Sequence, residues 1–385
     1  MTVQLSNEEV YREWAAEKRK DRTGLVVALV ITVLLFVFCL CWRYNAGYFT
    51  DKFVPAEYMK SYWLALKHVV LKIFRSDALA VCEQEIAAMD SIIYLGAIAR
   101  FKITVMTFAA GGAIAVAGAI FQTAYRNPMA SPNILGAGIG VRLGNVIVVS
   151  LYSTSAVASL LTRYKFCYGL TIICVGLILL IGRLLGGKKR TYSVMEMVMM
   201  GSIVTQGLNV LNMYLMYEMT EDDMLVLQQL QMGVTMNLDW VSVGIFFGVM
   251  AVSLIPVLIL RYRINIISLD KQETTSIGVS NTALSAVCQV CGVLMVTCAA
   301  IHCGDAGMIS MVIPYVVRKA VGSDFRKVCV YSLLSGGALM MVAKLVTSFV
   351  VIMGEMIPIS FVLNIVLTPV FMVITAKRRK EQAIM

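Results

Sequence analysis

Four uncharged polar residues follow one another through an apolar segment, and amide and hydroxyl groups of this kind can bind a polar solute or one another. Separated by four, three and three positions, they are Ser202, Gln206, Asn209 and Asn212. These spacings place them on one face of a helix. Such a face either joins neighbouring membrane helices through hydrogen bonds or lines a wet pathway, and both interpretations stay open from the spacing.

A second polar segment, RNPMASPNILG at 126–136, stands between two long apolar stretches. Pro128 and Pro132 each hold one φ angle and remove one backbone donor, so the segment predicts a stiff turn. A stiff turn can transmit a movement from one helix to the next. The alternative is that the turn is merely structural.

Two glycine patterns resemble nucleotide-binding loops, and both are incomplete. GRLLGGKK at 182–189 lacks the Ser or Thr after its first lysine that would ligate magnesium. Gly136, Gly138 and Gly140 follow no soluble strand, and small residues within a span more simply allow close helix approach. We therefore expect this chain to bind no nucleotide or other cofactor of its own.

The sequence also lacks the groups of residues that form catalytic or metal-binding sites. The chain has 2 histidines, His68 and His302, and no pair of carboxylates within an apolar block. Cys288 and Cys291 form C-x-x-C in mid-helix without a second pair, which favours helix packing over metal binding. Lys344 lies near the middle of a span, where it could snorkel, pair or line water. No catalytic or metal-ligating residue is predicted.

The elements that position these residues are membrane helices. The 385 residues are 59% hydrophobic and only 15% charged, against roughly 25% charged in soluble domains. The apolar residues gather in blocks long enough to cross a hydrocarbon core of about 30 Å. We predict an all-α polytopic membrane protein with ten spans at 24–42, 103–122, 134–152, 167–185, 194–217, 240–260, 281–302, 306–320, 330–350 and 358–375.

The distribution of basic residues predicts the orientation of these spans. The chain has a net charge of +10, and its basic residues cluster immediately before the first span, in the even-numbered loops and after the last span. Lys and Arg favour cytoplasmic loops, so both termini are expected in the cytoplasm and nucleic acid is not expected as a partner. The predicted units are a cytoplasmic segment 1–23, a transmembrane domain 24–376 and a basic tail 377–385.

The segment 43–101 is predicted to lie outside and is unusually long. Within it, apolar residues recur at helical spacing, at Tyr58, Met59, Trp63, Leu66, Val70 and Ile73. This pattern predicts an amphipathic helix that either lies along the outer membrane surface or forms a cap packed over the spans.

The turn at 126–136 strongly resembles the signature of the FecCD-type permeases of ABC importers, whose pattern is close to RNPLAxPxxLG. Family members precede it with a glycine-rich span that ends in Gln, and Gly111, Gly112, Gly118 and Gln122 occupy those places. Further segments agree in order, namely 268–279, GDAGMISMVIP at 304–314, and the pairs Pro358-Ile359 and Thr368-Pro369. The likeness covers roughly residues 95–380.

This resemblance implies an ABC type II importer permease fold in the cell membrane of a bacterium, carrying an iron-siderophore, haem or cobalamin-like chelate. Its implied partners are a second permease subunit, identical or not, two cytoplasmic ATPase subunits and an extracellular or periplasmic substrate-binding protein. ATP and Mg would be bound by the ATPase subunits, so this chain would be a transport subunit and not an enzyme. The resemblance does not name the chelate.

The resemblance also implies roles for particular residues. Asn127 and Met129 would form a cytoplasmic gate on the turn built by Arg126, Pro128 and Pro132. The stretch 221–233 would form a short helix that closes the pathway toward the outside, and the polar face at 202–212 is, from its spacing alone, the candidate lining of that pathway. Within a cytoplasmic loop at 261–280, the ATPase would contact Ser268, Asp270, Lys271, Gln272, Glu273 and Gly278. The alternative for this loop is an ordinary solvated connection.

The chain departs from the family pattern at several positions. Arg100 matches the first arginine of an RLPR segment, but Ile103 replaces the second and Lys102 stands beside it. Arg100 and Lys102 are accordingly predicted to dock the binding protein. The family's aspartate in the ninth span is Lys344, and the histidine after the eighth-span proline is Tyr315. Substrate and docking geometry thus stay open.

Two rival functions were weighed against an importer permease. A secondary transporter driven by an ion gradient would require carboxylates inside the membrane, and these are nearly absent. An enzyme embedded in the membrane would require a catalytic set. The importer permease is therefore the favoured interpretation.

Overall fold

The computed structural model describes residues 7–41, 55–73, 79–89, 91–156, 160–185, 194–232, 239–267, 281–352 and 355–384. These residues are almost entirely helical. The helices that correspond to apolar blocks are α1 (Asn7–Cys41), α4 (Ser91–Ala124), α5 (Ala137–Ala156), α6 (Leu160–Leu185), α7 (Val194–Tyr217), α9 (Trp240–Ile267), α11 (Asn281–Cys303), α12 (Gly307–Val321), α13 (Phe325–Phe349) and α14 (Ile359–Ile384). The other elements are α2 (Pro55–Ile73), α3 (Leu79–Ala87), the 3₁₀ turn η1 (Pro132–Leu135), α8 (Glu221–Met232) and the strands β1 (Val351–Ile352) and β2 (Glu355–Met356).

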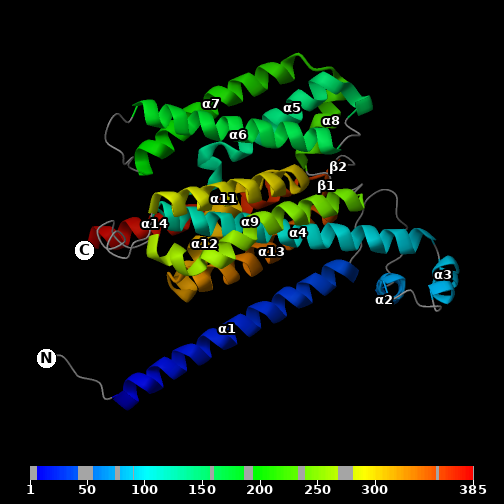
Figure 1. Cartoon of the computed structure of the whole chain (residues 1–385), viewed down its shortest axis with the longest axis horizontal. Coiled ribbons are helices and arrows are strands. Elements are labelled where there is room, and N and C mark those ends of the chain that lie inside the picture. The colour runs from blue at the N-terminus through cyan, green and yellow to red at the C-terminus, as the bar shows by residue number, and fades with distance from the viewer. Residues whose placement is uncertain are drawn as a thin grey trace.

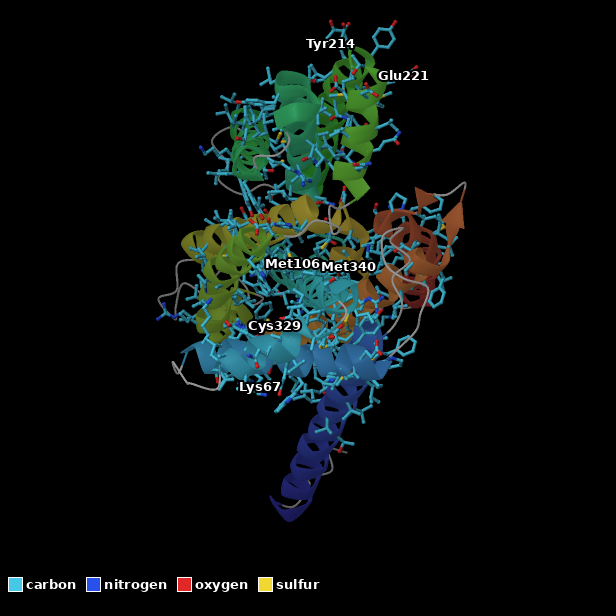
Figure 2. All side chains as sticks on the ribbon, turned by 90° about the vertical axis from the view of Figure 1, so that its right-hand side faces the viewer. Lys67, Met106, Tyr214, Glu221, Cys329 and Met340 are labelled. Atoms are coloured by element: carbon cyan, nitrogen blue, oxygen red, sulfur yellow. The ribbon has the colours of Figure 1, made fainter. Side chains whose placement is uncertain are left out.

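The long helices form two packed groups. Helices α4, α9, α11, α12, α13 and α14 make the larger group, while α5, α6, α7 and α8 lie along one side of it (Figure 1). Helix α1 runs along the opposite side and contacts α13 and α4. Met106 of α4 and Met340 of α13 lie in the centre of the larger group, whereas Tyr214 and Glu221 lie at the far edge of the smaller one (Figure 2).

Glycines allow α4 to lie at the centre of the larger group. A Cβ on Gly111 would overlap the backbone of α13 at Gly336, and a Cβ on Gly118 would overlap the Ser310 carbonyl of α12. The same device joins α5 to α6, because a Cβ on Gly140 would lie 2.5 Å from Thr171 Cα. The glycines thus permit close helix approach, which the sequence predicted for Gly140.

Each of the ten predicted spans coincides with one of the described helices. By length and composition, six described helices could cross a membrane: Thr23–Cys41, Ile93–Ala124, Leu161–Ile181, Trp240–Asn265, Leu284–Cys303 and Phe325–Phe349. Two further segments, Ala137–Tyr152 and Ile359–Val373, are apolar but shorter. Helix α12 has 15 residues, in agreement with the short eighth span. The predicted short helix at 221–233 is α8.

Several boundaries differ from those predicted. Helix α4 begins at Ser91 and not at 103, because no proline interrupts 91–102 and its charged side chains are covered. The guanidinium of Arg100 lies 4.0 Å from the centre of the Tyr58 ring, and the Lys102 ammonium lies 4.3 Å from that of Trp240. Helices α1 and α14 likewise extend into the predicted terminal segments 1–23 and 377–385.

The amphipathic helix predicted within 43–101 is α2. It is joined to α3 by an ion pair of 2.8 Å between Lys67 Nζ and Glu85 Oε2, and both helices lie beside the first turns of α4 (Figure 1). Tyr58 and Leu64 are buried by this packing, so α2 does cap part of the helix bundle. An apolar face remains exposed, formed by Met59, Trp63, Leu66, Val69 and Val70.

Candidate translocation site

The turn after α4 is built by its own side chains. Arg126 has a φ of 50°, the only positive φ among the described non-glycine residues. The Met129 N–H donates to Asn127 Oδ1 at 2.9 Å, and the Ala130 N–H donates to the Asn127 carbonyl at 3.1 Å. Asn127 thereby shapes the turn, and Met129 is left 41% exposed at its tip. Pro132 then begins η1, in which its missing N–H costs nothing.

Side chains also fasten the end of α4 to α12. Gln122 Nε2 donates to the Met311 carbonyl at 2.9 Å. Arg318 Nη2 donates to Thr123 Oγ1 at 2.6 Å and to the Ala119 carbonyl at 3.1 Å. The predicted gate turn is therefore rooted in the contact between α4 and α12, and a displacement of α12 would reach it directly.

A charged group lies on the other side of η1, and sequence reasoning missed it. Asp305, in the turn between α11 and α12, accepts hydrogen bonds from Asn133 Nδ2 at 3.4 Å and from the Gly307 N–H at 3.2 Å. Its Oδ2 lies 3.6 Å from Arg142 Nη1 of α5. The signal was present, since Arg142 stands inside the predicted span 134–152.

The polar face of α7 divides into three environments. Asn209 Oδ1 accepts from Arg142 Nη2 at 3.4 Å, which ties α7 to α5. Asn212 is buried and donates to Met216 Sδ within the same helix. Ser202 is exposed and donates to the Met199 carbonyl at 2.8 Å, and Gln206 is exposed. Of these four polar residues, only Asn209 contacts Arg142, which pairs with Asp305.

A polar cavity of about 210 Å³ adjoins Arg142. It is lined by α5, α8, the α11–α12 turn and the start of α14, through Gly138, Val141, Arg142, Asn145, Gln231, Ala300, Gly304, Asp305, Ser360 and Asn364. A side chain at position 138 would narrow this cavity, because a Cβ there would lie 3.0 Å from Asp305 Oδ2.

Behind this cavity lies a second guanidinium. Arg163 of α6 is 2% exposed and donates to Asn145 Oδ1 at 2.9 Å, to the Leu230 carbonyl at 3.1 Å and to the Ile301 carbonyl at 2.7 Å. Its partners belong to α5, α8 and α11. One side chain therefore holds four helices together around the cavity. Next to it, Tyr164 hydrogen-bonds the His302 ring.

The residues predicted to dock the binding protein are covered in part. Arg100 is 3% exposed beneath Tyr58, and its Nη1 is buried without a hydrogen-bond partner. It could meet an external protein only if α2 moved away. Lys102 is half-buried against Trp240 and remains accessible in this arrangement.

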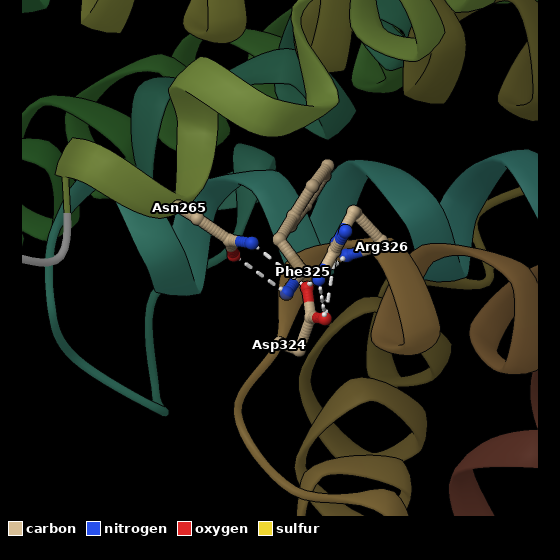
Figure 3. A network of polar contacts seen from close by, with 4 residues as sticks. All are labelled: Asn265, Asp324, Phe325 and Arg326. Carbon is tan, nitrogen blue, oxygen red and sulfur yellow. Dashed lines mark hydrogen bonds and ion pairs between the residues drawn. The ribbon is translucent and has the colours of Figure 1, made fainter. Parts of the chain in front are cut away.

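The residues predicted to contact the ATPase, from Ser268 to Gly278, lie outside the described residues. The helix that leads into this loop is anchored immediately before it (Figure 3). Asn265 Nδ2 donates to Asp324 Oδ1 at 2.8 Å, and the Phe325 N–H donates to Asn265 Oδ1 at 2.7 Å. Asp324 also caps α13, pairing with Arg326 Nη2 at 2.7 Å.

Hydrogen bonds from Arg326 and Asn265 lower the pKa of Asp324 from its usual 3.8 to about 2. This carboxylate therefore stabilises the fold at every pH above its ordinary pKa, and the contribution is lost as the pH falls from about 4 toward 2.

We expect Asp324→Ala to lower stability by about 1 kcal/mol, the usual value of an N-cap. Thermal unfolding in detergent at pH 7 should show the loss. The difference between the variant and the wild type should shrink as the pH approaches 3. Asp222→Ala, at an exposed carboxylate on α8, is the matched control. Equal melting temperatures of wild type and Asp324→Ala at pH 7 would contradict the anchoring role.

Lys344 is 8% exposed within α13. It is therefore buried inside the bundle and does not snorkel. Cys288 and Cys291 are buried free thiols. Within the described part of the chain, no group of three His, Cys, Asp or Glu side chains is arranged to hold a metal ion.

Long apolar helices around a charged cavity, with a proline-containing turn at the end of the central helix, indicate a polytopic membrane protein. The chain belongs to the FecCD transport family, which it matches over residues 61–377.

Its curated relatives carry names of the same kind. An iron chelatin transport system permease of Helicobacter pylori (strain 26695), so named with the qualifier "probable", is 24% identical over 75% of this chain and 90% of its own length. The Fe(3+) dicitrate transport system permease protein FecC of Escherichia coli is 26% identical over 70% and 79%. A heme-iron transport system permease, IsdF of Staphylococcus aureus (strain Newman), again "probable" by name, is 27% identical over 67% and 74%.

The fold has a solved counterpart. A chain described as an inward-facing conformation of a metal-chelate type ABC transporter matches with a TM-score of 0.69 at 19% identity, covering 93% of this chain and 99% of its own. At this identity the likeness concerns the fold alone. It agrees with the fold class predicted from the sequence.

Proposed function

We propose that this chain is the permease subunit of an ATP-driven importer for an iron chelate, with iron-siderophore, haem and cobalamin-like chelates as the candidate cargo. The observation that carries the proposal is the family match over 61–377 together with relatives named for iron chelatin, dicitrate and heme-iron transport. The chain supplies the pathway and its gates.

The partners follow from the same proposal. A second permease subunit completes the pathway, two cytoplasmic ATPase subunits bind ATP and Mg, and an external binding protein delivers the chelate. Both termini then lie in the cytoplasm, in accord with the basic residues at 18–22 and 377–380. Asn127 and Met129 act as the cytoplasmic gate, since Met129 is exposed at the tip of a turn that Asn127 shapes.

Co-purification tests the proposal. The chain should be extracted in detergent together with an ATPase subunit, and proteoliposomes that hold this complex should take up a chelate only with ATP and the binding protein present. Uptake by the purified chain alone, driven by an ion gradient, would show a secondary transporter instead.

Charge reversal in the predicted coupling loop should separate hydrolysis from uptake. We expect Lys271→Glu combined with Glu273→Lys to leave ATPase activity within about twofold and to lower uptake at least tenfold, because contacts across the subunit boundary transmit the movement. Parallel ATPase and uptake assays on one preparation would measure this. Lys165→Glu, at an exposed position on α6, is the control. Normal uptake in the double variant would remove the coupling role.

The binding protein should depend on Lys102. We expect Lys102→Glu to weaken its capture several-fold at low salt, with the difference fading near 1 M salt, where the Debye length is about 3 Å. Arg100→Glu should instead lower thermal stability, because the guanidinium is buried beneath Tyr58. Binding measured across a salt series distinguishes the two. A loss of affinity at Lys102→Glu that is insensitive to salt would exclude electrostatic docking.

A further inference from the structure

We propose that the cavity beside Arg142 is a binding site for a carboxylate group of the cargo, with Arg142 as the residue that binds it. This inference rests on the proposed function and adds the chemical class of the cargo, which would be an anionic chelate. Three features of the molecule support it: the charge around the cavity, the unused donors of Arg142 and the polar walls.

The cavity is surrounded by more positive than negative charge. Among its described lining residues, Arg142 is the one cation and Asp305 the one carboxylate, and the second guanidinium, Arg163, lies behind the wall and donates to Asn145. Arg163 is held by three neutral oxygens, and no carboxylate of the described chain pairs with it. These oxygens belong to the wall or adjoin it, because Asn145 lines the cavity, Leu230 precedes Gln231 and Ile301 follows Ala300. In surroundings of low polarity, an uncompensated cation gives the cavity a positive potential.

Neighbouring side chains hold Arg142 in place, but its N–H donors are not all used in hydrogen bonds. Its Nη1 lies 3.6 Å from Asp305 and its Nη2 lies 3.4 Å from Asn209, whereas a close guanidinium–carboxylate pair spans about 2.7–2.9 Å. Its Nε is buried with no hydrogen-bond partner. Asp305 meanwhile accepts from Asn133 and from the Gly307 N–H. Arg142 thus retains donors for an incoming carboxylate, and 37% of its side chain is exposed.

The other walls suit the polar end of a larger molecule. Asn145, Gln231, Ser360 and Asn364 bring amide and hydroxyl groups from α5, α8 and α14. A volume of about 210 Å³ is smaller than the roughly 300–1,000 Å³ of pockets that enclose a drug-sized ligand. This space admits a carboxylate with a few neighbouring atoms but not a whole chelate, so one end group of the cargo would enter while the rest occupies the wider path.

The alternative is that Arg142 and Asp305 form a structural ion pair and nothing more. The two interpretations predict opposite signs for one variant. If Arg142 binds the cargo, Asp305 competes with it, and Asp305→Asn should strengthen binding. The asparagine oxygen can still accept from the Gly307 N–H. If the pair is structural, either single substitution should be harmful and the double substitution should recover.

The experiment uses the whole complex in nanodiscs and in proteoliposomes. The probes are ferric dicitrate and haem, which carry carboxylates, and an uncharged ferric tris-hydroxamate. The variants are Arg142→Gln, Asp305→Asn and the double variant, with Arg261→Gln, an exposed arginine on α9, as the control. Equilibrium binding without ATP and uptake with ATP are measured separately.

We expect Arg142→Gln to weaken binding and uptake of a carboxylate-bearing probe at least tenfold, and Asp305→Asn to strengthen its binding several-fold. The double variant should resemble Arg142→Gln, and the hydroxamate should respond to none of these changes. Recovery in the double variant, an equal effect on charged and uncharged probes, or a wild type that imports only the hydroxamate would each overturn the proposal and leave the importer function intact. A wild type that imports no chelate, with its ATPase and binding protein present, would instead contradict the proposed function.

Discussion

Replacing Gly118 with alanine is expected to remove most of the folded protein that detergent can extract. The new Cβ would overlap the Ser310 carbonyl oxygen, which is backbone and cannot rotate away, so α4 and α12 would have to separate. Overpacking of this kind costs about 1–3 kcal/mol. Its consequence would extend to the gate turn, because Gln122 and Arg318 join the same two helices within two turns of Gly118.

Gly176→Ala is the matched control, since it makes the same substitution in another apolar helix. No atom lies within 4 Å of a Cβ at Gly176, and alanine favours helix over glycine by up to about 1 kcal/mol. We therefore expect unchanged or slightly higher stability there. Fluorescence-detected size exclusion after a series of heating steps measures both variants. Similar melting temperatures for the two would show that α4 and α12 are not in close contact.

Replacing Arg163 with methionine is expected to destabilise the contact between the two groups of helices. The Leu230 and Ile301 carbonyls would lose their donor, while Asn145 Oδ1 would keep the Cys167 thiol at 3.4 Å. A buried polar group left without a partner costs about 1–3 kcal/mol, so two such groups predict a loss of roughly 2–6 kcal/mol, reduced by the relief of no longer burying a charge.

Two further variants make this prediction specific. Lys165→Met, two positions along α6 at an exposed site, should leave stability unchanged. Arg163→Lys keeps the charge but cannot present a planar fork to three oxygens, so it should lose stability while largely retaining the positive potential of the cavity. A melting temperature of Arg163→Met equal to that of the wild type would mean that the three hydrogen bonds add nothing to stability.

The sequence predicted the apolar helices of the fold correctly, but it did not predict all of their ends. All ten apolar blocks became helices, because length and hydropathy are local properties of the chain. The boundary of α4 was wrong because charge was taken as the end of the span, whereas Tyr58 and Trp240 cover Arg100 and Lys102. Those aromatic residues lie far away along the chain, so no local pattern announces them.

In the candidate site, too, the sequence predicted the local features and missed contacts between distant residues. The turn at 126–136 was recognisable because its prolines, asparagine and glycine act within a few residues of one another. Of the polar face on α7, only Asn209 reaches the charged group, because a shared helical face does not reveal which neighbour covers which residue. Arg142 and Asp305 were missed because one charge in an apolar block and another in a loop do not disclose that they are partners.

The sequence by itself determined that the chain forms membrane helices, since a backbone in hydrocarbon must satisfy its own hydrogen bonds and runs of apolar residues have that one outcome. It also determined the stiff turn, because proline restricts the residue that carries it. Only the tertiary structure decided which polar groups meet. Asn133 and Asp305 are separated by 172 positions and Arg163 and Ile301 by 138. Such contacts depend on how helices pack, and in this chain the glycines that set helix distances act together with side chains from distant segments.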